Sequence, residues 1–420
     1  MNIEKFKKIG VIGFKKTGIA LCKLLISLGK KVKVSEKESE EDFPSSLVEN
    51  FKKEGVKFEF GGHSERFLRD CDLVVISPGV DLKRSLIGKT IHRLSLPCVG
   101  EIELASWFTH SRIIAITGTN GKTTLSFLTF LLLKKKFPSV YLGGNIGVPF
   151  SSFVRKTHPQ DLVVLEVSSF QLESILKFRP YVSCIINLEP DHLDRYSNFK
   201  EYKEAKERIF MNQKKEDFAV INRNISCCKE WEGKIKAKIL YFGDNDENEN
   251  ISCLKTIASI FGIESSYIKE TLSRFKGLPH RMQKIAQIKE VLFINDSKAT
   301  NPSATLWALK NIKKPAILIA GGKDKGLDYT SILPFLGKVK KINLIGEAKE
   351  KIRASLKNHF KNIQLFSDLR NAVEDAFLNA SCGDVVLFSP MCSSFDMFSN
   401  YIERGNYFIR IVNELKAKFK

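Results

Sequence analysis

The chain has 420 residues, 43% hydrophobic and 27% charged, and this composition is typical of a globular protein with about two to four domains. Its formal net charge of +20 is typical of proteins that bind nucleic acid or anionic membranes. However, the lysines occur in pairs and short runs, such as Lys134 to Lys136, without a single basic tract interleaved with aromatic residues. The pattern favours a solvated surface and polyphosphate ligands, so neither nucleic-acid binding nor membrane insertion is expected.

The cysteines and the first residues indicate the compartment. Nine cysteines, an odd number, lack the paired Cys-x-x-Cys spacing of a zinc site, which favours reduced thiols. The opening MNIEKFKKIGVIGF contains too short an apolar stretch for a secretory leader or a membrane span. A cytoplasmic protein is therefore expected, and a monomer is the expected form.

The first block of the chain, residues 1–98, alternates predicted strands and helices. Residues 8–12 form a short apolar run followed by glycines, and the helical pattern that comes next ends at Gly29. Further strands are predicted at 31–35 and 72–77. Buried apolar strands that alternate with helices indicate a parallel sheet.

Two more α/β blocks follow, at 99–279 and 280–420. A polar stretch, DNDENEN at 244–250, predicts a surface loop within the first of them. Three doubly wound domains are the expected architecture. The apolar runs that predict the strands of these two blocks lie at 112–116, 161–167, 182–187, 218–222, 291–295, 316–320, 342–345 and 385–388.

A glycine-rich loop at 118–124 separates the strand 112–116 from a helix predicted at 125–133. Glycines allow backbone N–H groups to surround phosphate oxygens, and the helix N-terminus adds partial positive charge. Lys122 then reaches the β- and γ-phosphates, and the Thr123 hydroxyl ligates Mg²⁺. The alternative, a turn without a ligand, is disfavoured by the Lys-Thr pair. The residues of this predicted ATP loop are Gly118, Thr119, Asn120, Gly121, Lys122, Thr123 and Thr124.

The glycines near the N-terminus give a weaker signal. Gly10, Gly13 and Gly18 resemble a dinucleotide-binding loop, but Lys15 occupies the place of the middle glycine, where a side chain hinders a pyrophosphate. A nicotinamide cofactor is therefore disfavoured. A looser diphosphate site with Lys16, Thr17 and, near the sugar or base, Glu36 remains one interpretation, and a purely structural tight turn is the other.

Two further side chains follow strands of the second block. Glu166 ends the predicted strand 161–167, and His192 comes soon after 182–187. Together with Thr123 they are candidates for a Mg²⁺ site, because carboxylate, imidazole and hydroxyl groups are acceptable ligands beside water. The alternative for His192 is a hydrogen bond to a neighbouring aspartate.

Four charged residues have no distinctive pattern of their own. Lys206 lies in an amphipathic helix predicted at 201–210, where a solvated lysine is the default interpretation. Arg281 follows Leu-Pro-His, and Asp296 and Lys298 follow the strand 291–295.

Taken together, these residues resemble a known family. The chain is similar to the Mur ligases, and within them to the branch that adds D-glutamate to UDP-N-acetylmuramoyl-L-alanine. The matching stretches occur in family order over nearly the whole chain. They are GTNGKTT at 118–124, GGNIG at 143–147, EVSSFQLE at 166–173, DHLDRY at 191–196, EAKERIF at 204–210, GLPHR at 277–281, NDSKATN at 295–301, GGKDKG at 321–326 and SPMCSSFDMF at 389–398.

The resemblance implies three domains: a Rossmann-like domain for the UDP-substrate at 1–98, a central P-loop ATPase at 99–279, and a Rossmann-like domain for the amino acid at 280–420. It implies ATP and Mg²⁺ as cofactors, with Lys122, His192 and Lys206 as catalytic residues and Lys206 carbamylated by CO₂. Thr123, Glu166, His192 and the Lys206 carbamate would serve the metal. Beyond the P-loop, the implied ATP contacts are Asn250, Arg281 and Asp296.

The resemblance also assigns the two other substrates. The implied contacts of the UDP-substrate are Lys16, Thr17, Glu36, Ser77, Gly79, Asn145 and His192. The implied contacts of D-glutamate are Lys298, Thr300, Lys325, Ser394, Phe395 and Tyr401. In the implied reaction, a substrate carboxylate is phosphorylated by ATP, and the amino group of D-glutamate then displaces the phosphate.

Other functions remain as alternatives. Within the same class they are the other Mur ligases and folylpolyglutamate synthase, although the latter lacks an α/β domain of this size before its P-loop. From other classes they are a P-loop NTPase without ligase activity and a nicotinamide-dependent oxidoreductase, which Lys15 disfavours.

Overall fold

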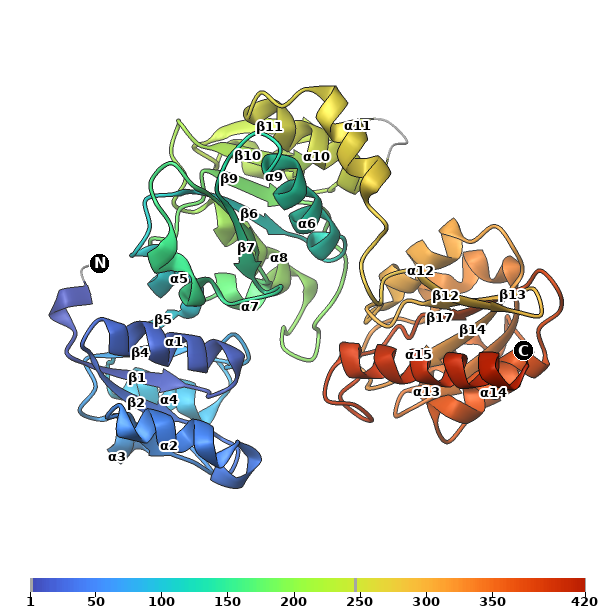
Figure 1. The fold of residues 1–420 in the computed structure, drawn as a ribbon, viewed down its shortest axis with the longest axis horizontal. Helices are drawn as coiled ribbons and strands as arrows, with labels where there is room; N and C mark the ends of the chain where they lie inside the picture. Colours follow the sequence, from blue (N-terminus) through green and yellow to red (C-terminus); the bar gives the residue numbers. More distant parts are fainter. Residues whose placement is uncertain (1–2, 245–247, 420) are drawn as a thin grey trace. The chain divides into compact units, whose positions relative to one another are not determined.

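The computed structural model describes residues 3–244 and 248–419 of the chain. These residues form three β-sheets, each flanked by helices (Figure 1). The chain divides into two compact units, Met1–Leu188 with Lys200–Arg274 and Glu189–Phe199 with Phe275–Lys420. The first two sheets lie in the first unit and the third sheet in the second unit. The predicted α/β class with three domains is confirmed, whereas the boundaries at 98 and 279 stay predictions.

The first sheet is parallel throughout, in the order β3-β2-β1-β4-β5. Alternate residues of a strand point to opposite faces, so Ile9 and Val11 join one core cluster with α1, while Ile12 joins a second cluster with α4. Both faces are therefore covered. The elements are η1 (Ile3–Lys5), β1 (Lys8–Ile12), α1 (Lys16–Ser27), β2 (Lys31–Ser35), η2 (Glu40–Asp42), α2 (Ser45–Lys53), β3 (Lys57–Glu59), α3 (Glu65–Leu68), β4 (Leu73–Ile76), α4 (Leu86–Arg93) and β5 (Cys98–Gly100).

The second sheet is also parallel, in the order β11-β10-β9-β6-β8-β7. Its carboxyl ends lie at one edge, where open α/β sheets bind ligands. Its strands are β6 (Arg112–Thr117), β7 (Val140–Gly144), β8 (Leu162–Glu166), β9 (Val182–Ile185), β10 (Phe218–Asn222) and β11 (Lys238–Phe242). Its helices are α5 (Glu101–Ser106), α6 (Lys122–Leu133), η3 (Phe150–Ser152), η4 (Val154–Lys156), α7 (Ser169–Leu172), α8 (Phe199–Glu207), η5 (Arg208–Phe210), α9 (Cys228–Glu232), α10 (Glu249–Ile260) and α11 (Ser265–Arg274).

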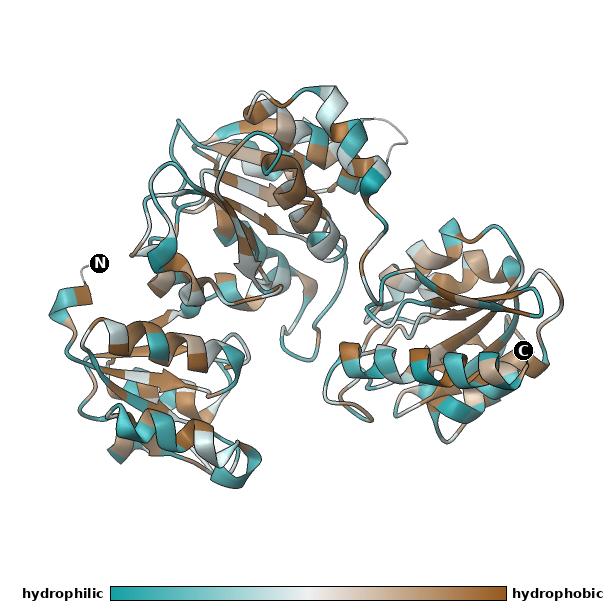
Figure 2. Cartoon of the chain, viewed as in Figure 1, coloured by the Kyte–Doolittle hydropathy of each residue, from teal (hydrophilic) through white to brown (hydrophobic). Residues whose placement is uncertain are grey.

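The third sheet has one antiparallel edge strand, β12, in the order β12-β13-β17-β14-β15-β16. Leu318 packs into one core cluster with α12, whereas Ile317 and Ile319 pack into another with α14 and α15. The elements are β12 (Gln283–Ile288), β13 (Val291–Asn295), α12 (Pro302–Asn311), β14 (Ala316–Gly321), η6 (Thr330–Lys338), β15 (Val339–Ile345), α13 (Lys349–Leu356), β16 (Ile363–Leu365), α14 (Leu369–Leu378), β17 (Val385–Phe388) and α15 (Tyr401–Lys418). Figure 2 shows the hydrophobic colour concentrated along the strands.

Every predicted strand is present. Those at 8–12, 31–35, 218–222, 291–295 and 385–388 have the predicted bounds, and the others have shifted ends. The helix predicted at 125–133 begins earlier, at Lys122, and the helix at 201–210 is α8 followed by a 3-10 turn. The loop predicted at 244–250 ends where α10 begins at Glu249, and its residues 245–247 lie outside the described residues.

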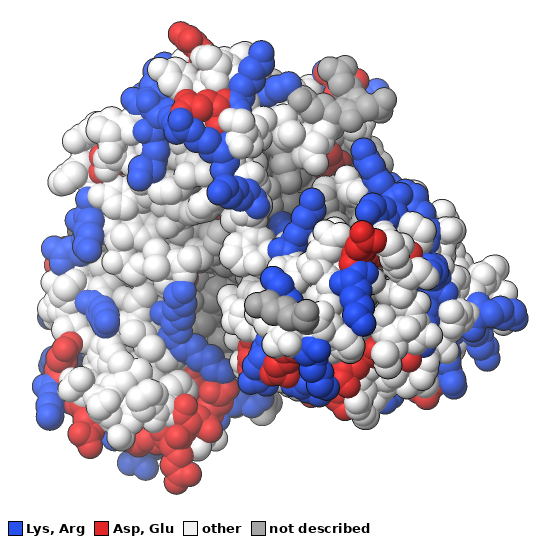
Figure 3. Space-filling view, turned by 45° about the vertical axis from the view of Figure 1, so that its right-hand side comes forward, with Lys and Arg blue, Asp and Glu red and all other residues white. Residues whose placement is uncertain are grey.

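The surface charge agrees with the scattered lysines of the sequence. In Figure 3, Lys and Arg side chains form separate groups on the visible face, with uncharged surface between them. No helix among residues 3–244 and 248–419 is long and apolar enough to cross a membrane.

Candidate active site

The loop at 118–121 joins β6 to α6 and has the backbone of a phosphate cradle. Gly121 is the N-cap of α6 and has a left-handed conformation, with φ +82°, and Gly118 has φ +153°. A Cβ atom at Gly121 would lie 2.6 Å from Asn250 Oδ1, so Asn250 would have to move away from the loop. The loop therefore requires glycine for its conformation and for the approach of Asn250. Its position at a helix N-terminus suits an anion.

Asn187 holds this loop from the neighbouring strand. Its side-chain Oδ1 accepts hydrogen bonds from the backbone N–H groups of Thr119 (3.1 Å) and Asn120 (2.9 Å). Its Nδ2 donates to Glu249 (2.9 Å), which also accepts from Asn222 (3.1 Å). Glu249 thereby fixes which end of the Asn187 amide faces the loop. Neither residue was predicted from the sequence, where the only signal was that Asn187 follows a strand and Glu249 begins a helix.

Two lysines donate to the same backbone oxygen of the loop. Lys122 Nζ donates to Gly118 O (2.8 Å) and Thr119 O (2.7 Å), and Lys206 Nζ donates to Gly118 O (2.8 Å) and Thr117 Oγ1 (3.2 Å). Lys206 is only 1% exposed. The solvated-lysine interpretation of Lys206 is therefore wrong, because α8 turns this side chain inward beneath the loop.

Tyr202, one turn earlier on α8, contacts both Lys206 and the P-loop. Its ring lies 4.8 Å from Lys206 Nζ, and its hydroxyl lies 3.1 Å from Thr119 Oγ1. Both residues are buried. The helix α8 thus places an aromatic ring and an ammonium group against the P-loop.

Glu166 lies at the carboxyl end of β8, next to the end of β6 that leads into the P-loop. Its side chain is buried, and its Oε1 accepts a hydrogen bond from Asn145 Nδ2 (2.7 Å). Asn145 follows β7, which pairs with β8. Thr123, in the first turn of α6, is also buried. Three predicted contacts of metal or substrate therefore lie at one edge of one sheet.

The N-terminal glycine loop is a tight turn closed by Glu36. The carboxylate of Glu36 accepts hydrogen bonds from the backbone N–H groups of Phe14 (2.5 Å) and Glu38 (3.1 Å). A Cβ at Gly18 would lie 1.9 Å from Gly13 O, so α1 approaches the loop through a glycine. Glu36 therefore stabilises the turn, and whether the turn also binds a diphosphate stays a prediction.

Among the other predicted UDP contacts, Lys16 and Thr17 begin α1 directly after this turn, whereas Asn145 and His192 belong to other parts of the chain. Lys15 is exposed and pairs with Glu38 (2.5 Å), while Lys16 donates to the backbone oxygen of Gly147. Thr17 lies in the first turn of α1. Ser77 and Gly79 follow β4, which pairs with β1, so they lie at the same edge of the sheet.

In the second unit, Asp191 accepts hydrogen bonds from side chains that follow strands of the third sheet. It accepts hydrogen bonds from Lys325 Nζ (3.2 Å), Asn301 Nδ2 (3.0 Å) and the backbone N–H of His192 (2.8 Å). Burial raises the pKa of Asp191, but Lys325, His192 and the hydrogen bonds outweigh it and hold the pKa below its usual range. The segment of His192, predicted within the central domain, thus belongs to the second compact unit.

His192 itself has a left-handed backbone with φ +55°, and its Nε2 lies 3.7 Å from Asp191 Oδ2. The neighbour contact that the sequence suggested as an alternative is therefore present, mainly through the backbone. Such a backbone conformation is uncommon for a residue other than glycine and concentrates at functional sites.

Asp296 follows β13 and is buried. Its carboxylate accepts hydrogen bonds from the Met282 backbone N–H (3.1 Å) and Ser389 Oγ (2.9 Å). Burial raises the pKa of Asp296 to about 6, although Arg281 and the two hydrogen bonds act in the opposite direction. Asp296 and Arg281 thus interact within the second unit, and their role as ATP contacts stays a prediction.

The predicted amino-acid contacts lie at the carboxyl edge of the third sheet. One of them is more exposed than the others. Lys298 Nζ donates to Tyr401 Oη (2.9 Å) and lies 4.1 Å from the Tyr401 ring centroid. Ser394 is buried, Thr300 is half-buried, and Phe395 is 67% exposed. Phe395 is therefore the most exposed of these side chains within its own unit.

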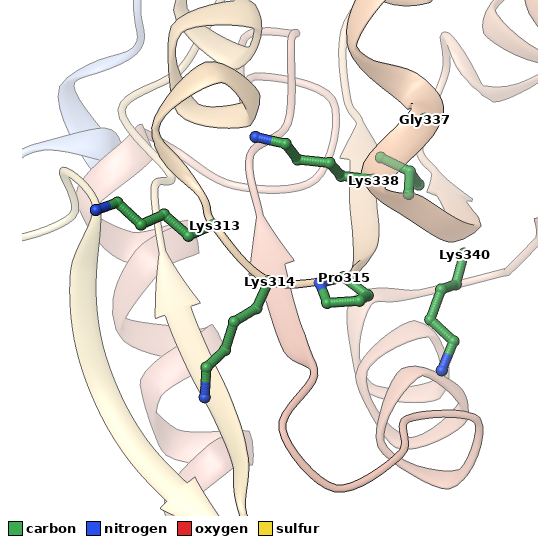
Figure 4. Close-up of a pocket in the computed structure, with 7 residues that line it drawn as sticks. Lys313, Lys314, Pro315, Gly337, Lys338 and Lys340 are labelled. Atoms are coloured by element: carbon green, nitrogen blue, oxygen red, sulfur yellow. The ribbon is translucent and has the colours of Figure 1, made fainter.

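A basic hollow of about 370 Å³ lies at the opposite, amino-terminal edge of the third sheet, lined by Lys313, Lys314, Lys338 and Lys340 among others (Figure 4). Lys338 donates to Ile312 O (2.9 Å), and Lys340 pairs with Asp384 (2.6 Å). Figure 4 shows the four ammonium groups well separated, with none directed at another. They do not converge on one anion, so this hollow is not the candidate site.

Comparisons with known proteins agree with this geometry. Three family models match: "Mur ligase MurD-like, N-terminal domain" at 7–100, "Mur ligase middle domain" at 116–276 and "Mur ligase, glutamate ligase domain" at 280–392. The UDP-N-acetylmuramoylalanine–D-glutamate ligase of Thermoanaerobacter sp. is 38% identical, with 98% of this chain and 99% of the relative covered.

The chain belongs to the Mur ligase family. Solved structures of more distant Mur ligases share its fold. The UDP-N-acetylmuramate-alanine ligase MurC of Thermotoga maritima gives a TM-score of 0.60 at 18% identity, with 97% of this chain and 100% of that chain covered. The MurF ligase of the same organism, solved in complex with ADP, gives 0.60 at 16% identity, with 92% and 94% covered. Mur ligases use ATP and Mg²⁺.

Proposed function

We propose that this Mur ligase joins D-glutamate to UDP-N-acetylmuramoyl-L-alanine, with ATP, through an acyl phosphate. The observation that carries the proposal is the similarity over 98% of the chain to a relative of that name. The P-loop and the buried groups around it supply the chemistry that such a reaction needs.

The residues of the first unit fit ATP and Mg²⁺. The glycine loop opens a helix, as a phosphate cradle requires. Beside it, Asn250 Oδ1 is buried and has no hydrogen-bond partner among the described residues, so it suits a ligand that brings an N–H donor, as adenine does. Thr123 and Glu166 offer a hydroxyl and a carboxylate, which are oxygen ligands that Mg²⁺ accepts together with water. Bound Mg²⁺ would neutralise charge on the transferring phosphoryl group.

The proposed reaction has two steps. The terminal carboxylate of UDP-N-acetylmuramoyl-L-alanine attacks the γ-phosphorus, and the bond to the ADP oxygen breaks. The amino group of D-glutamate then attacks the acyl carbon, phosphate leaves, and the amide forms with loss of one proton. Lys122 and the N–H groups of the loop would stabilise negative charge in the first step.

We assign the remaining roles as the motifs suggest. Asn145, His192 and the turn with Lys16, Thr17, Glu36, Ser77 and Gly79 serve the UDP-substrate, and Arg281 and Asp296 serve ATP. Lys298, Thr300, Lys325, Ser394, Phe395 and Tyr401 serve D-glutamate. We retain 1–98, 99–279 and 280–420 as the domains and a cytoplasmic monomer as the form, which suits nine free thiols.

The proposal includes a carbamate at Lys206. Lys122 and Lys206 each place an ammonium group 2.8 Å from Gly118 O, and two like charges so arranged repel each other. If the neutral Lys206 amine attacks CO₂, an N–C bond forms and one proton leaves to solvent. The product is an anion with two oxygens that could serve Mg²⁺. The burial of Lys206 at the P-loop supports this role.

The carbamate has its own test. Lys206→Ala should lose most activity and regain part of it with acetate, and the wild-type enzyme should lose activity when CO₂ and bicarbonate are removed. Lys200→Ala, an exposed position on the same helix, is the matched control. Full activity of Lys206→Ala would reject the role, and impairment without rescue would leave Lys206 a positional role only.

The overall function is tested by leaving out one reactant at a time. Release of ADP and phosphate should require ATP, Mg²⁺, UDP-N-acetylmuramoyl-L-alanine and D-glutamate together. A P-loop NTPase without ligase activity is the rival from another class, and it would release phosphate at the same rate when the amino acid is left out.

A further inference from the structure

Arg404 is a fully buried arginine whose role the motifs do not explain. It lies in the first turn of α15, is 0% exposed, and has no ion pair among residues 3–244 and 248–419. Its guanidinium instead donates to four oxygens: Nη1 to Cys392 O and Ser393 O (both 3.1 Å), Nη2 to Ser297 O (2.8 Å) and Nε to Ser297 Oγ (3.1 Å).

Such an arrangement is costly for the fold. A charge taken out of water loses its hydration, and an apolar side chain of similar size would avoid that cost. Burial lowers the pKa of Arg404 to about 10, which Cys392 and Asp396 partly oppose, so the guanidinium remains charged at neutral pH. The cost indicates that the four hydrogen bonds serve something besides packing.

The four oxygens belong to two segments at one edge of the sheet. Ser297 lies in the segment after β13, and Cys392 and Ser393 lie in the segment after β17, the strand that pairs with β13. Ser297 Oγ also donates to Tyr401 O (2.9 Å), so the start of α15 is tied to the same point. The proposed D-glutamate contacts Lys298 and Ser394 are the next residues along each segment.

A third segment packs against the same guanidinium. A Cβ at Gly322 would lie 2.3 Å from Ser393 O and 3.1 Å from Arg404 Nη1, so only glycine allows this approach. Gly322 opens the stretch that leads to Lys325. Three segments that carry proposed D-glutamate contacts thus meet around one side chain.

We infer that Arg404 is a positioning residue for the amino-acid substrate: its guanidinium holds the segments of Ser297 and Ser393 in register, so that Lys298 and Ser394 face the same ligand. The inference rests on the proposed placement of D-glutamate. A lysine could not replace it, because a single ammonium group lacks the planar fork that reaches oxygens on two segments.

The test measures KM for D-glutamate and for ATP in Arg404→Lys and Arg404→Ala. Loss of the fork leaves buried carbonyl oxygens unsatisfied and the two segments free to shift. We expect KM for D-glutamate to rise by about 10- to 100-fold, while KM for ATP changes less than about twofold. Added guanidinium should restore part of the D-glutamate affinity of Arg404→Ala. Arg410→Ala, an exposed position on the same helix, should behave as wild type.

Other results would overturn the inference. An unchanged KM for D-glutamate with a lowered thermal midpoint would make Arg404 a packing residue only, and so would an equal rise of KM for ATP or a failure of guanidinium to rescue. If Arg404→Ala does not fold, Arg404→Lys and Ser297→Ala decide, and a D-glutamate KM equal to wild type in both rejects the inference.

Lys325→Ala separates the two proposals. If it raises KM for D-glutamate and Arg404→Lys does not, the inference about Arg404 alone fails. If neither variant changes that KM, the proposed placement of D-glutamate fails with it.

Discussion

Lys122 is the residue whose role the loop geometry defines most closely. Its ammonium donates to Gly118 O and Thr119 O at the start of α6, where transferring phosphoryl charge would be stabilised. We expect Lys122→Ala to lose about 10²–10³ in kcat, the usual loss when one charge-stabilising group is removed. The thermal midpoint should stay near that of wild type, because Asn187 still holds the loop through the backbone N–H groups of Thr119 and Asn120.

Steady-state kinetics and thermal unfolding of the same preparation check this prediction. Lys134→Ala, at the other end of α6, is the matched control and should retain activity. Near-normal turnover of Lys122→Ala would mean that Lys122 is not the phosphate lysine.

Asp296 predicts a pH dependence of stability. Its pKa is about 6 in the folded protein against an ordinary 3.8, so between about pH 4 and pH 6 the folded state binds more protons than the unfolded state. The contribution of Asp296 to the free energy of unfolding therefore falls as the pH rises through that window, by about 3 kcal/mol in all. Asp191 has a lowered pKa and acts below this window, where stability is lost as the pH falls.

Thermal unfolding as a function of pH checks the sign. The midpoint of the transition that includes the third sheet should fall across the window in wild type and change less in Asp296→Asn. A fall of equal size in both proteins would contradict the assignment of the shift to Asp296.

At the residue scale, the sequence predicted which types of residue form the site better than it predicted how deeply each side chain is buried. Lys122 and Thr123 were predictable because their spacing after glycines is specific. The burial of Lys206 was not, since EYKEAKERIF is charged on most of its positions and α8 looks solvated in isolation. Arg404 was not predicted either. Its four hydrogen-bond acceptors are backbone or hydroxyl oxygens, and they lie in segments distant in the sequence.

At the scale of elements, α15 contains a glycine, Gly405, which is unfavourable for the helix taken by itself. A Cβ at Gly405 would lie 2.2 Å from His280 Nδ1, and that buried ring is near Asn295 Nδ2 (3.1 Å). In an open helix, Gly→Ala stabilises by about 1 kcal/mol. Here we expect Gly405→Ala to destabilise by about 1–3 kcal/mol, because the ring or the helix must move.

Chemical denaturation of Gly405→Ala measures this effect. Gly233→Ala is the control, because its Cβ meets nothing within 4 Å and its φ of −78° suits alanine. A gain of stability in Gly405→Ala would show that the contact with His280 is relieved without cost.

Elements buried on both faces were the most predictable. β13 and β17 have the predicted bounds because continuous apolar runs leave no ambiguity. The strands that were not predicted are β3, β5, β7, β11, β12 and β16. Of these, β3, β5 and β16 have three residues each, and β7, β11 and β12 are partly exposed, so their patterns resemble loops.

At the scale of the whole molecule, the order of motifs along the chain carried the family assignment, and three sheets of the expected class bear it out. The first two predicted domains fall in one compact unit, and two segments of the predicted central domain, 189–199 and 275–279, group with the third sheet instead. The first of these, Glu189–Phe199, contacts the third sheet through Asp191 and its partners. No strand pattern could reveal this, because the segment is irregular and its contacts are made by side chains.

The central claim is the choice of acceptor. Amide formation from UDP-N-acetylmuramoyl-L-alanine, ATP and Mg²⁺ should be measured side by side with D-glutamate, L-glutamate and diaminopimelate, with the product identified by mass. We expect product with D-glutamate and none with the other two amino acids. Equal turnover with L-glutamate or diaminopimelate would contradict it while leaving the chain a Mur ligase.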